Sequence, residues 1–204
     1  MRRTTCLLAV AAVLVSGLAV AANKSKTDRT IGGTGFVLQS ELISRLPEVA
    51  EAIGAVDADP QNPAGWNDLG HALASRGAYA DAVAAFEFST KIKGDDPDVW
   101  VDMGAAQLRQ GKIGPAKSAF QRALKVEPFH ALAFYNLGLA FQADNDYEGA
   151  LDNLERALLL DPTLGDPRIN GQAANNELLP MVKHRVYLRT IGGNPALFTP
   201  ATKR

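Results

Sequence analysis

The sequence is nearly without cysteine. Cys6 is the only one, and it lies near the amino terminus, ahead of an apolar run. A chain that loses residues 1–22 on export would contain no thiol, which excludes a disulfide, a thiol nucleophile, a Cys-x-x-Cys-His haem site and a cysteine-rich zinc site. We therefore expect the folded part to be held together by packing alone.

Histidines and ligand motifs are equally scarce. The three histidines, His71, His130 and His184, lie far apart, and no metal-ligand spacing joins any of them to a carboxylate. Gly32–Gly35 lacks the Lys-Ser ending of a phosphate loop, and Asp144–Asp146 lacks the downstream ligands of an EF-hand. The sequence thus predicts no metal, no cofactor and no catalytic residues, so we expect a protein that is not an enzyme.

Positive charge is not concentrated in the way that nucleic-acid binding requires. No cluster of Lys and Arg is interleaved with aromatic residues, which make up only 7% of the chain. The net charge of −1 hides an asymmetry, because residues 63–164 carry nine basic and 14 acidic side chains, whereas residues 165–204 carry six basic and two acidic. Nucleic acid is therefore not an expected partner, and the carboxyl-terminal end is basic.

The first 22 residues have the three parts of a secretory signal peptide. Arg2 and Arg3 supply a basic start, residues 7–18 are almost entirely apolar, and Ala19–Ala21 offers small residues to an export peptidase. Residues 6–22 are 17 in number, at the lower limit for crossing a bilayer, so an uncleaved inner-membrane anchor is the alternative. We expect an exported, periplasmic protein whose only link to the membrane is this segment, if it is retained.

A 34-residue internal repeat dominates the rest of the sequence. Each unit has two apolar stretches of helical periodicity, separated by a turn at Gly77, Gly111 or Asp144–Asp146. The glycine and alanine columns predict close helix crossings, because a larger side chain there would push the helix axes apart. The recurring positions are Trp66, Trp100 and Phe134; Gly70, Gly104 and Gly138; Ala82, Ala116 and Ala150; Phe86, Phe120 and Leu154.

These columns resemble the tetratricopeptide repeat family over residues 63–164. The units are residues 63–96, 97–130 and 131–164, with modest departures such as Gly94 where proline is usual. The resemblance implies an all-α fold: a right-handed α-solenoid of antiparallel helix pairs, in which stacked neighbours bury a continuous core. It also implies a protein–protein interaction scaffold.

The segments outside the repeats are predicted to tether and cap the stack. Residues 23–35 are polar and contain a Gly-Gly pair, which indicates a flexible tether, and residues 36–62 indicate an N-terminal helical pair, a degenerate repeat, with Pro47 starting its second helix. Residues 165–204 are predicted to form a C-terminal capping helix, over residues 176–190, and a basic tail. Arg-Thr-Ile-Gly-Gly occurs at both 29–33 and 189–193, an echo for which the sequence offers no physical account.

In the tetratricopeptide repeat family, the first helix of each unit lines a concave groove. Of the groove positions, Tyr135 and Leu139 are the strongest candidates, because exposed apolar side chains are more informative than charges. Asp98 could be ordinary surface, and Asp102 and Asn136 could instead hydrogen-bond within the stack. By this resemblance, the partner-binding groove comprises Asn67, His71, Val101, Asp102, Arg109, Tyr135, Asn136, Leu139 and Gln142.

An acidic rim with an apolar, aromatic end favours a neutral or basic extended peptide or helix as partner. Together with the export signal, this is similar to bacterial envelope repeat proteins, so we expect an adaptor in the assembly or maturation of an envelope complex. The alternative is a self-assembling structural protein that forms homo-oligomers through its acidic repeats and its basic tail. That tail contains Lys183, Arg185, Arg189, Lys203 and Arg204.

Overall fold

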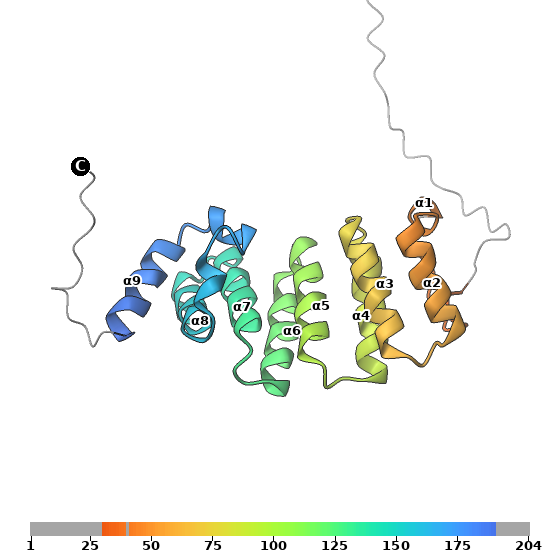
Figure 1. Ribbon diagram of the computed structural model, residues 1–204, viewed down its shortest axis with the longest axis horizontal. Coiled ribbons are helices and arrows are strands. Elements are labelled where there is room, and N and C mark those ends of the chain that lie inside the picture. The colour runs from red at the N-terminus through yellow and green to blue at the C-terminus, as the bar shows by residue number, and fades with distance from the viewer. Residues whose placement is uncertain (1–29, 40, 191–204) are drawn as a thin grey trace, which may run out of the picture.

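The computed structural model describes residues 30–39 and 41–190, which form a row of antiparallel helices (Figure 1). The three repeats are pairs of similar length, and a short pair precedes them. Two 3-10 helices and one α-helix follow. The elements are α1 (Glu41–Ser44), α2 (Pro47–Ala58), α3 (Pro63–Ser75), α4 (Tyr79–Ile92), α5 (Pro97–Arg109), α6 (Ile113–Val126), α7 (Ala131–Ala143), α8 (Tyr147–Leu160), η1 (Pro162–Gly165), η2 (Gly171–Asn175) and α9 (Leu179–Thr190).

Local sequence sets where these helices begin and turn. Pro47, Pro63 and Pro97 stand at the first helical positions, where a missing N–H costs nothing. The turns inside the first two units contain Gly77 and Gly111 at φ of 76° and 74°, a region that favours glycine. The third unit uses a non-glycine residue there, an asparagine at φ 61°, which is the next most tolerant type.

The glycine column lies where the two helices of each unit cross, as predicted. A Cβ atom added to Gly104 would come within 2.5 Å of the Phe120 ring, and one added to Gly138 within 2.7 Å of Leu154. Phe120 and Leu154 are themselves fully buried. Each glycine therefore allows α3, α5 or α7 to approach the second helix of its own unit closely enough to bury that side chain.

The first helices of the units lie on the inner side of the array. α5 contacts both α3 and α7 directly, in addition to packing between α4 and α6. Because the helices of one series approach each other more closely than those of the other, the stack curves toward them. This arrangement confirms the predicted all-α solenoid and gives α3, α5 and α7 the inner face.

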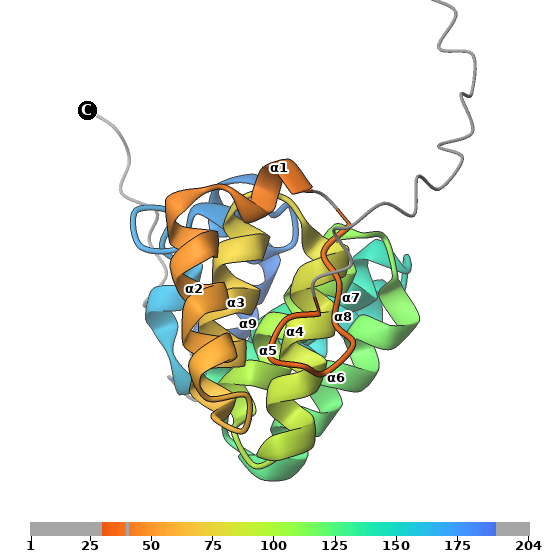
Figure 2. The ribbon, with the colours of Figure 1, turned by 90° about the vertical axis from the view of Figure 1, so that its right-hand side faces the viewer.

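The N-terminal turn, residues 31–36, corrects the predicted tether. Ile31 and Phe36 form an antiparallel bridge and are 4% and 6% exposed, and the Gly32 N–H donates a hydrogen bond of 2.8 Å to Asp57 of α2. Figure 2 shows this turn lying against α2 and α4. The prediction was wrong over these residues because the Gly-Gly pair, at positive φ, serves a tight turn between two apolar anchors.

Asp81 predicts a pH effect on stability. Its carboxylate is buried at the start of α4, where burial raises its pKa, although it accepts hydrogen bonds from the Gln39 N–H at 3.2 and 3.3 Å. A raised folded-state pKa means that wild-type stability falls as pH rises through that pKa. We expect Asp81→Asn, which keeps an acceptor for Gln39, to be more stable than wild type at pH 7 and equal to it near pH 3.

Chemical denaturation of both proteins at a series of pH values measures this difference. The exposed Asp95 is the matched control, because Asp95→Asn should leave the pH dependence of stability unchanged. A stability difference at Asp81 that does not vary with pH would contradict the burial argument.

Candidate functional site

The structure separates the nine predicted groove residues into two groups. Six remain at least partly exposed on the first helices, and three are buried. The accessible residues are Asn67, His71, Asp102, Arg109, Leu139 and Gln142, and the buried ones are Val101, Tyr135 and Asn136. The two groups have different roles, because a buried side chain cannot contact a partner without local unfolding.

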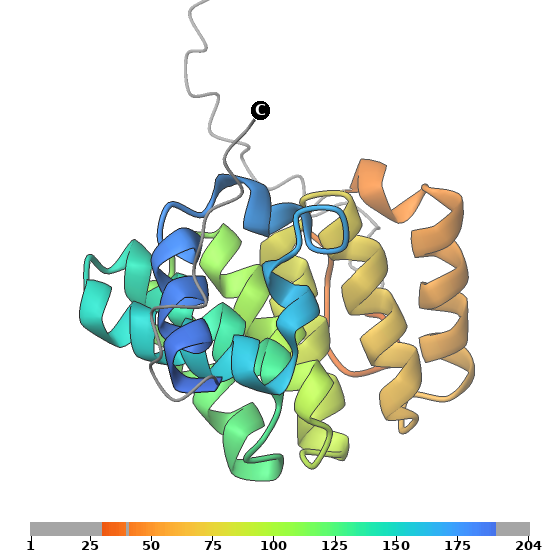
Figure 3. The ribbon, with the colours of Figure 1, turned by 60° about the vertical axis from the view of Figure 1, so that its left-hand side comes forward.

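Tyr135 is not an exposed groove residue, contrary to the prediction. It is 1% exposed and packs in one cluster with Ala173 of η2 and with Leu179 and Val182 of α9. Figure 3 shows this C-terminal segment lying along the end of the helix array. The C-terminal helix was predicted to cap the last repeat, and the burial of Tyr135 shows that this cap includes the predicted groove face of α7.

The Tyr135 hydroxyl is buried without a hydrogen-bond partner of good geometry in the described part of the chain. Burial raises its pKa, and the neighbouring amides of Asn170 and Asn176 only partly offset that rise. The ring therefore serves packing, and its ionisation is irrelevant at neutral pH. Val101 is also buried inside the protein, because it packs with Ala133 of the next unit.

Two histidine–aspartate pairs connect the first helices of neighbouring units, the second of them through the N-cap residue of α7. His71 Nε2 lies 3.3 Å from Asp102 Oδ2, which links α3 to α5, and His130 Nε2 lies 2.9 Å from Asp98 Oδ1, which links α7 to α5. His130 Nδ1 also accepts the Ala133 N–H at 3.1 Å and so caps α7. This geometry assigns the remaining proton to Nε2 and makes His130 the donor to Asp98.

Two aspartates of the predicted acidic rim, Asp98 and Asp102, are therefore paired with histidines of the same chain. Burial raises the pKa of Asp102, and the attraction of His71 opposes that rise. Neither pair was predicted from the sequence. The signal that could have found them is their separation of almost one repeat length, because that spacing places residues side by side on adjacent first helices. No group of three or more His, Cys, Asp or Glu that could hold a metal occurs in residues 30–39 and 41–190.

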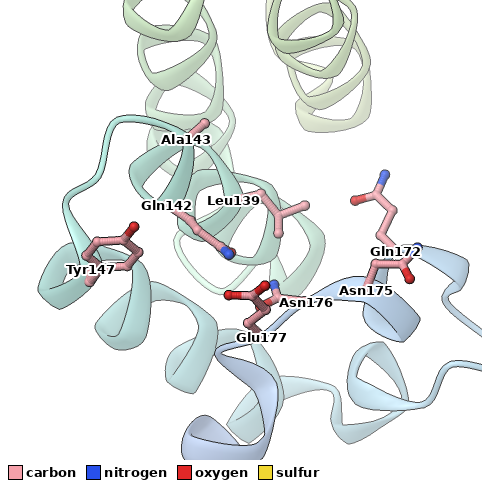
Figure 4. A pocket seen from close by; sticks show the side chains of 8 residues that line it. All are labelled: Leu139, Gln142, Ala143, Tyr147, Gln172, Asn175, Asn176 and Glu177. Carbon is pink, nitrogen blue, oxygen red and sulfur yellow. The ribbon is translucent and has the colours of Figure 1, made fainter.

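A pocket of about 440 Å³ lies between α7 and the segment around η2 (Figure 4). Leu139 and Gln142, two predicted groove residues, are among its lining side chains. The whole lining is Leu139, Gln142, Ala143, Tyr147, Gln172, Asn175, Asn176 and Glu177. Half of these residues lie beyond the repeats, in η2 and at the start of the segment predicted to cap the stack.

Asn176 anchors the far side of this pocket. Its side chain is 8% exposed, and its Oδ1 accepts the Leu178 N–H at 2.9 Å just before α9 begins. Its Nδ2 has no hydrogen-bond partner among the described residues. The amide instead lies beside the buried Tyr135 hydroxyl, so Asn176 joins the segment before α9 to α7.

The basic residues of α9 are largely used within the chain. Arg185 Nε lies 2.9 Å from Glu155 Oε2, and Arg189 Nε lies 2.6 Å from Glu155 Oε1. Arg185 also reaches Asp152 at 3.0 Å. Two of the five cations that the predicted homo-oligomer would use are therefore paired with α8 of the same molecule, while Lys203 and Arg204 lie outside the described residues.

The predicted signal peptide, residues 1–22, lies outside the described residues. Among the helices that the structure does describe, none combines the length and the apolar character needed to cross a membrane.

Comparisons with known proteins agree with this geometry. A family model described as tetratricopeptide repeat matches residues 47–97 and 101–165, whereas comparison with curated proteins gave no match. The fold is similar to the crystal structure of MamA, with a TM-score of 0.56 and 20% identity, covering 71% of this chain and 85% of that one.

Two other solved structures show the same fold. The first tetratricopeptide domain of Spaghetti (RPAP3), bound to the HSP90 peptide SRMEEVD, gives a TM-score of 0.51 at 20% identity and covers 65% of this chain and 96% of that one. The Arabidopsis OM64 domain gives 0.50 at 17% identity and covers 62% and 95%. With the family model matching more than half of its residues, the chain belongs to the tetratricopeptide repeat family.

Proposed function

We propose that the protein is a non-enzymatic adaptor of the bacterial cell envelope that binds an extended segment of a partner protein along its inner face. The amide-lined pocket between α7 and η2 carries this proposal. Gln142, Gln172 and Asn175 present side-chain amides to it, and each amide offers both donors and acceptors. Such groups match the alternating N–H and C=O of an extended peptide, and Leu139 adds an apolar wall for one of its side chains.

Charge favours a neutral or basic segment. Glu177 is the charged residue of the pocket lining, and Asp98 and Asp102 lie further along the inner face. An acidic peptide such as the one bound to the RPAP3 domain would meet like charge here, which opposes binding. A lysine or arginine beside the bound backbone would instead face Glu177.

The envelope location rests on the first 22 residues. A basic start, an apolar run and small residues at 19–21 support export, with the segment either cleaved or retained as an inner-membrane anchor. Fusion of residues 1–30 to alkaline phosphatase, which is active only after export, tests the location. An inactive fusion would contradict it without affecting the pocket.

Photocrosslinking in living cells tests partner binding. A benzophenone amino acid replaces Ala143, an exposed residue of the pocket lining, in the full-length protein. The same amino acid at Ala80, exposed on α4, is the matched control. We expect a defined adduct with an envelope protein at Ala143 only, and equal adducts at both positions would contradict the proposal.

The affinity of the crosslinked partner then tests the role of the amides. The double variant Gln142→Ala/Gln172→Ala should weaken binding roughly tenfold, because each lost hydrogen bond contributes about 0.5–1.5 kcal/mol. Gln121→Ala, at an exposed position of α6, should bind as wild type does. Isothermal titration calorimetry measures both affinities. A double variant that binds the partner as tightly as wild type would show that these amides do not contribute to binding.

A further inference from the structure

The N-terminal turn, residues 31–36, shows what fits against the outer edge of the first repeat. The Phe36 ring packs edge-on against Trp66 at 5.6 Å and against Phe88 at 5.9 Å, and the Trp66 and Phe88 rings stack at 4.5 Å. The result is a three-ring cluster in which Phe36 is 6% exposed. An aromatic side chain on a short turn thus completes this repeat from outside.

The third repeat has the same position, and it is open. Two 34-residue steps carry Trp66 onto Phe134, Phe88 onto Arg156 and Pro60 onto Pro128. These three residues line a pocket of about 370 Å³ together with Phe129, Leu159 and Leu160. We call this pocket the third-repeat notch; it shares no residue with the amide-lined pocket.

The third-repeat notch contains three exposed large apolar side chains. Phe129 is 76% exposed, and Leu159 and Leu160 are 41% and 42% exposed, although all three are large apolar residues. Such residues scattered singly need no explanation, whereas a contiguous group marks an interaction site. In the first repeat, Phe36 packs against Trp66 and Phe88, the counterparts of Phe134 and Arg156.

We infer that the third-repeat notch binds an aromatic side chain carried on an extended or turn segment of a partner protein, with an acidic residue beside it. The aromatic preference follows from the Phe36 contact at the equivalent position. The acidic preference follows from Arg156, whose guanidinium lies over the Phe134 ring at 5.7 Å and has no carboxylate partner among the described residues. A carboxylate pairs with Arg156 while the aromatic side chain packs edge-on against Phe134, as Phe36 does against Trp66.

The repeated Arg-Thr-Ile-Gly-Gly sequence at 189–193 is not followed by an aromatic residue at the position of Phe36, because Ala196 stands there. We therefore assign the occupant to another protein.

A synthetic peptide with the sequence of residues 30–39 is a defined probe for the third-repeat notch, because it contains the one segment known to fit such a position. Titration into the isotope-labelled full-length protein, followed by NMR, should shift signals of Phe129, Arg156 and Leu159. A peptide with Phe36→Ala should lose this binding, and one with Val37→Glu should bind several-fold more tightly.

Protein variants distinguish specific binding at the third-repeat notch from nonspecific hydrophobic association. Leu159→Ser/Leu160→Ser should weaken the peptide roughly tenfold, whereas Ile169→Ser, at another exposed apolar residue, should not. Arg156→Ala should remove only the advantage of the Val37→Glu peptide. Shifts absent at millimolar peptide, or confined to Leu139 and Gln142, would overturn the inference, as would self-association that the Leu159→Ser/Leu160→Ser variant abolishes.

This result is independent of the proposed function. The Gln142→Ala/Gln172→Ala variant of the amide-lined pocket should bind the probe peptide as wild type does. Loss of notch binding with an intact amide pocket, or the reverse, therefore identifies which of the two proposals has failed.

Discussion

Replacing Gly104 with alanine is expected to destabilise the protein by about 1–3 kcal/mol, the range for overpacking a filled core. The added Cβ would lie 2.5 Å from the Phe120 ring, which is fully buried. Either the ring must leave its rotamer or α5 and α6 must separate, and both weaken the contact of this unit with its neighbours. Urea unfolding followed by circular dichroism measures the loss.

The same substitution at Gly54 is a control with the opposite expected sign. Gly54 lies within α2, and an added Cβ would meet nothing within 4 Å. Alanine is favoured over glycine inside a helix by about 0.5–1 kcal/mol, so Gly54→Ala should be more stable than wild type. Similar changes at Gly54 and Gly104 would mean that helix propensity, and not the close crossing, explains the glycine column.

The double variant Arg185→Ala/Arg189→Ala is expected to lose about 2–3 kcal/mol and the docking of α9. Breaking a buried ion pair costs about 3–5 kcal/mol because a charge remains without a partner, and the partial exposure of both arginines reduces that figure. Glu155 is the residue left behind, and it is 2% exposed. Denaturation measures the loss, and protease cleavage within residues 177–190 reports the release of α9.

A third substitution separates charge from packing. Glu155→Leu in the double-variant background removes the unpaired carboxylate and should recover most of the lost stability, since apolar replacement of a buried pair is often neutral. If stability stays low, the aliphatic stems of the arginines, not the pairing of Glu155, hold α9 in place.

The repeats could be predicted from the sequence because their cause is local and periodic. The glycine at position 104 has counterparts 34 residues away on either side, and each faces a large residue such as Phe120. Pro97 marks the start of α5, and Gly111 marks the turn after it. Each of these residues acts within its own unit. The fold of one unit can therefore be predicted from its own residues, and the 34-residue period extends that prediction to the other units.

The site was predicted less completely because it depends on contacts between segments that do not repeat. Tyr135 and Leu139 occupy neighbouring turns of α7, yet only Leu139 reaches the pocket, since η2 and α9 cover Tyr135. No periodic signal places Asn176 beside α7. The burial of Glu155 beneath Arg185 has the same origin, because their packing depends on how the chain turns after the last repeat.

The covering of Tyr135 by the C-terminal segment gives the inner face a direction. At α3 and α5 this face is lined by surface residues such as His71 and Asp102, but at α7 the chain's own residues occupy part of it. For the proposed extended partner, we therefore expect a path along the first helices that ends at the amide-lined pocket. Such a path would favour a chain end or a sharp bend over a segment that passes straight through.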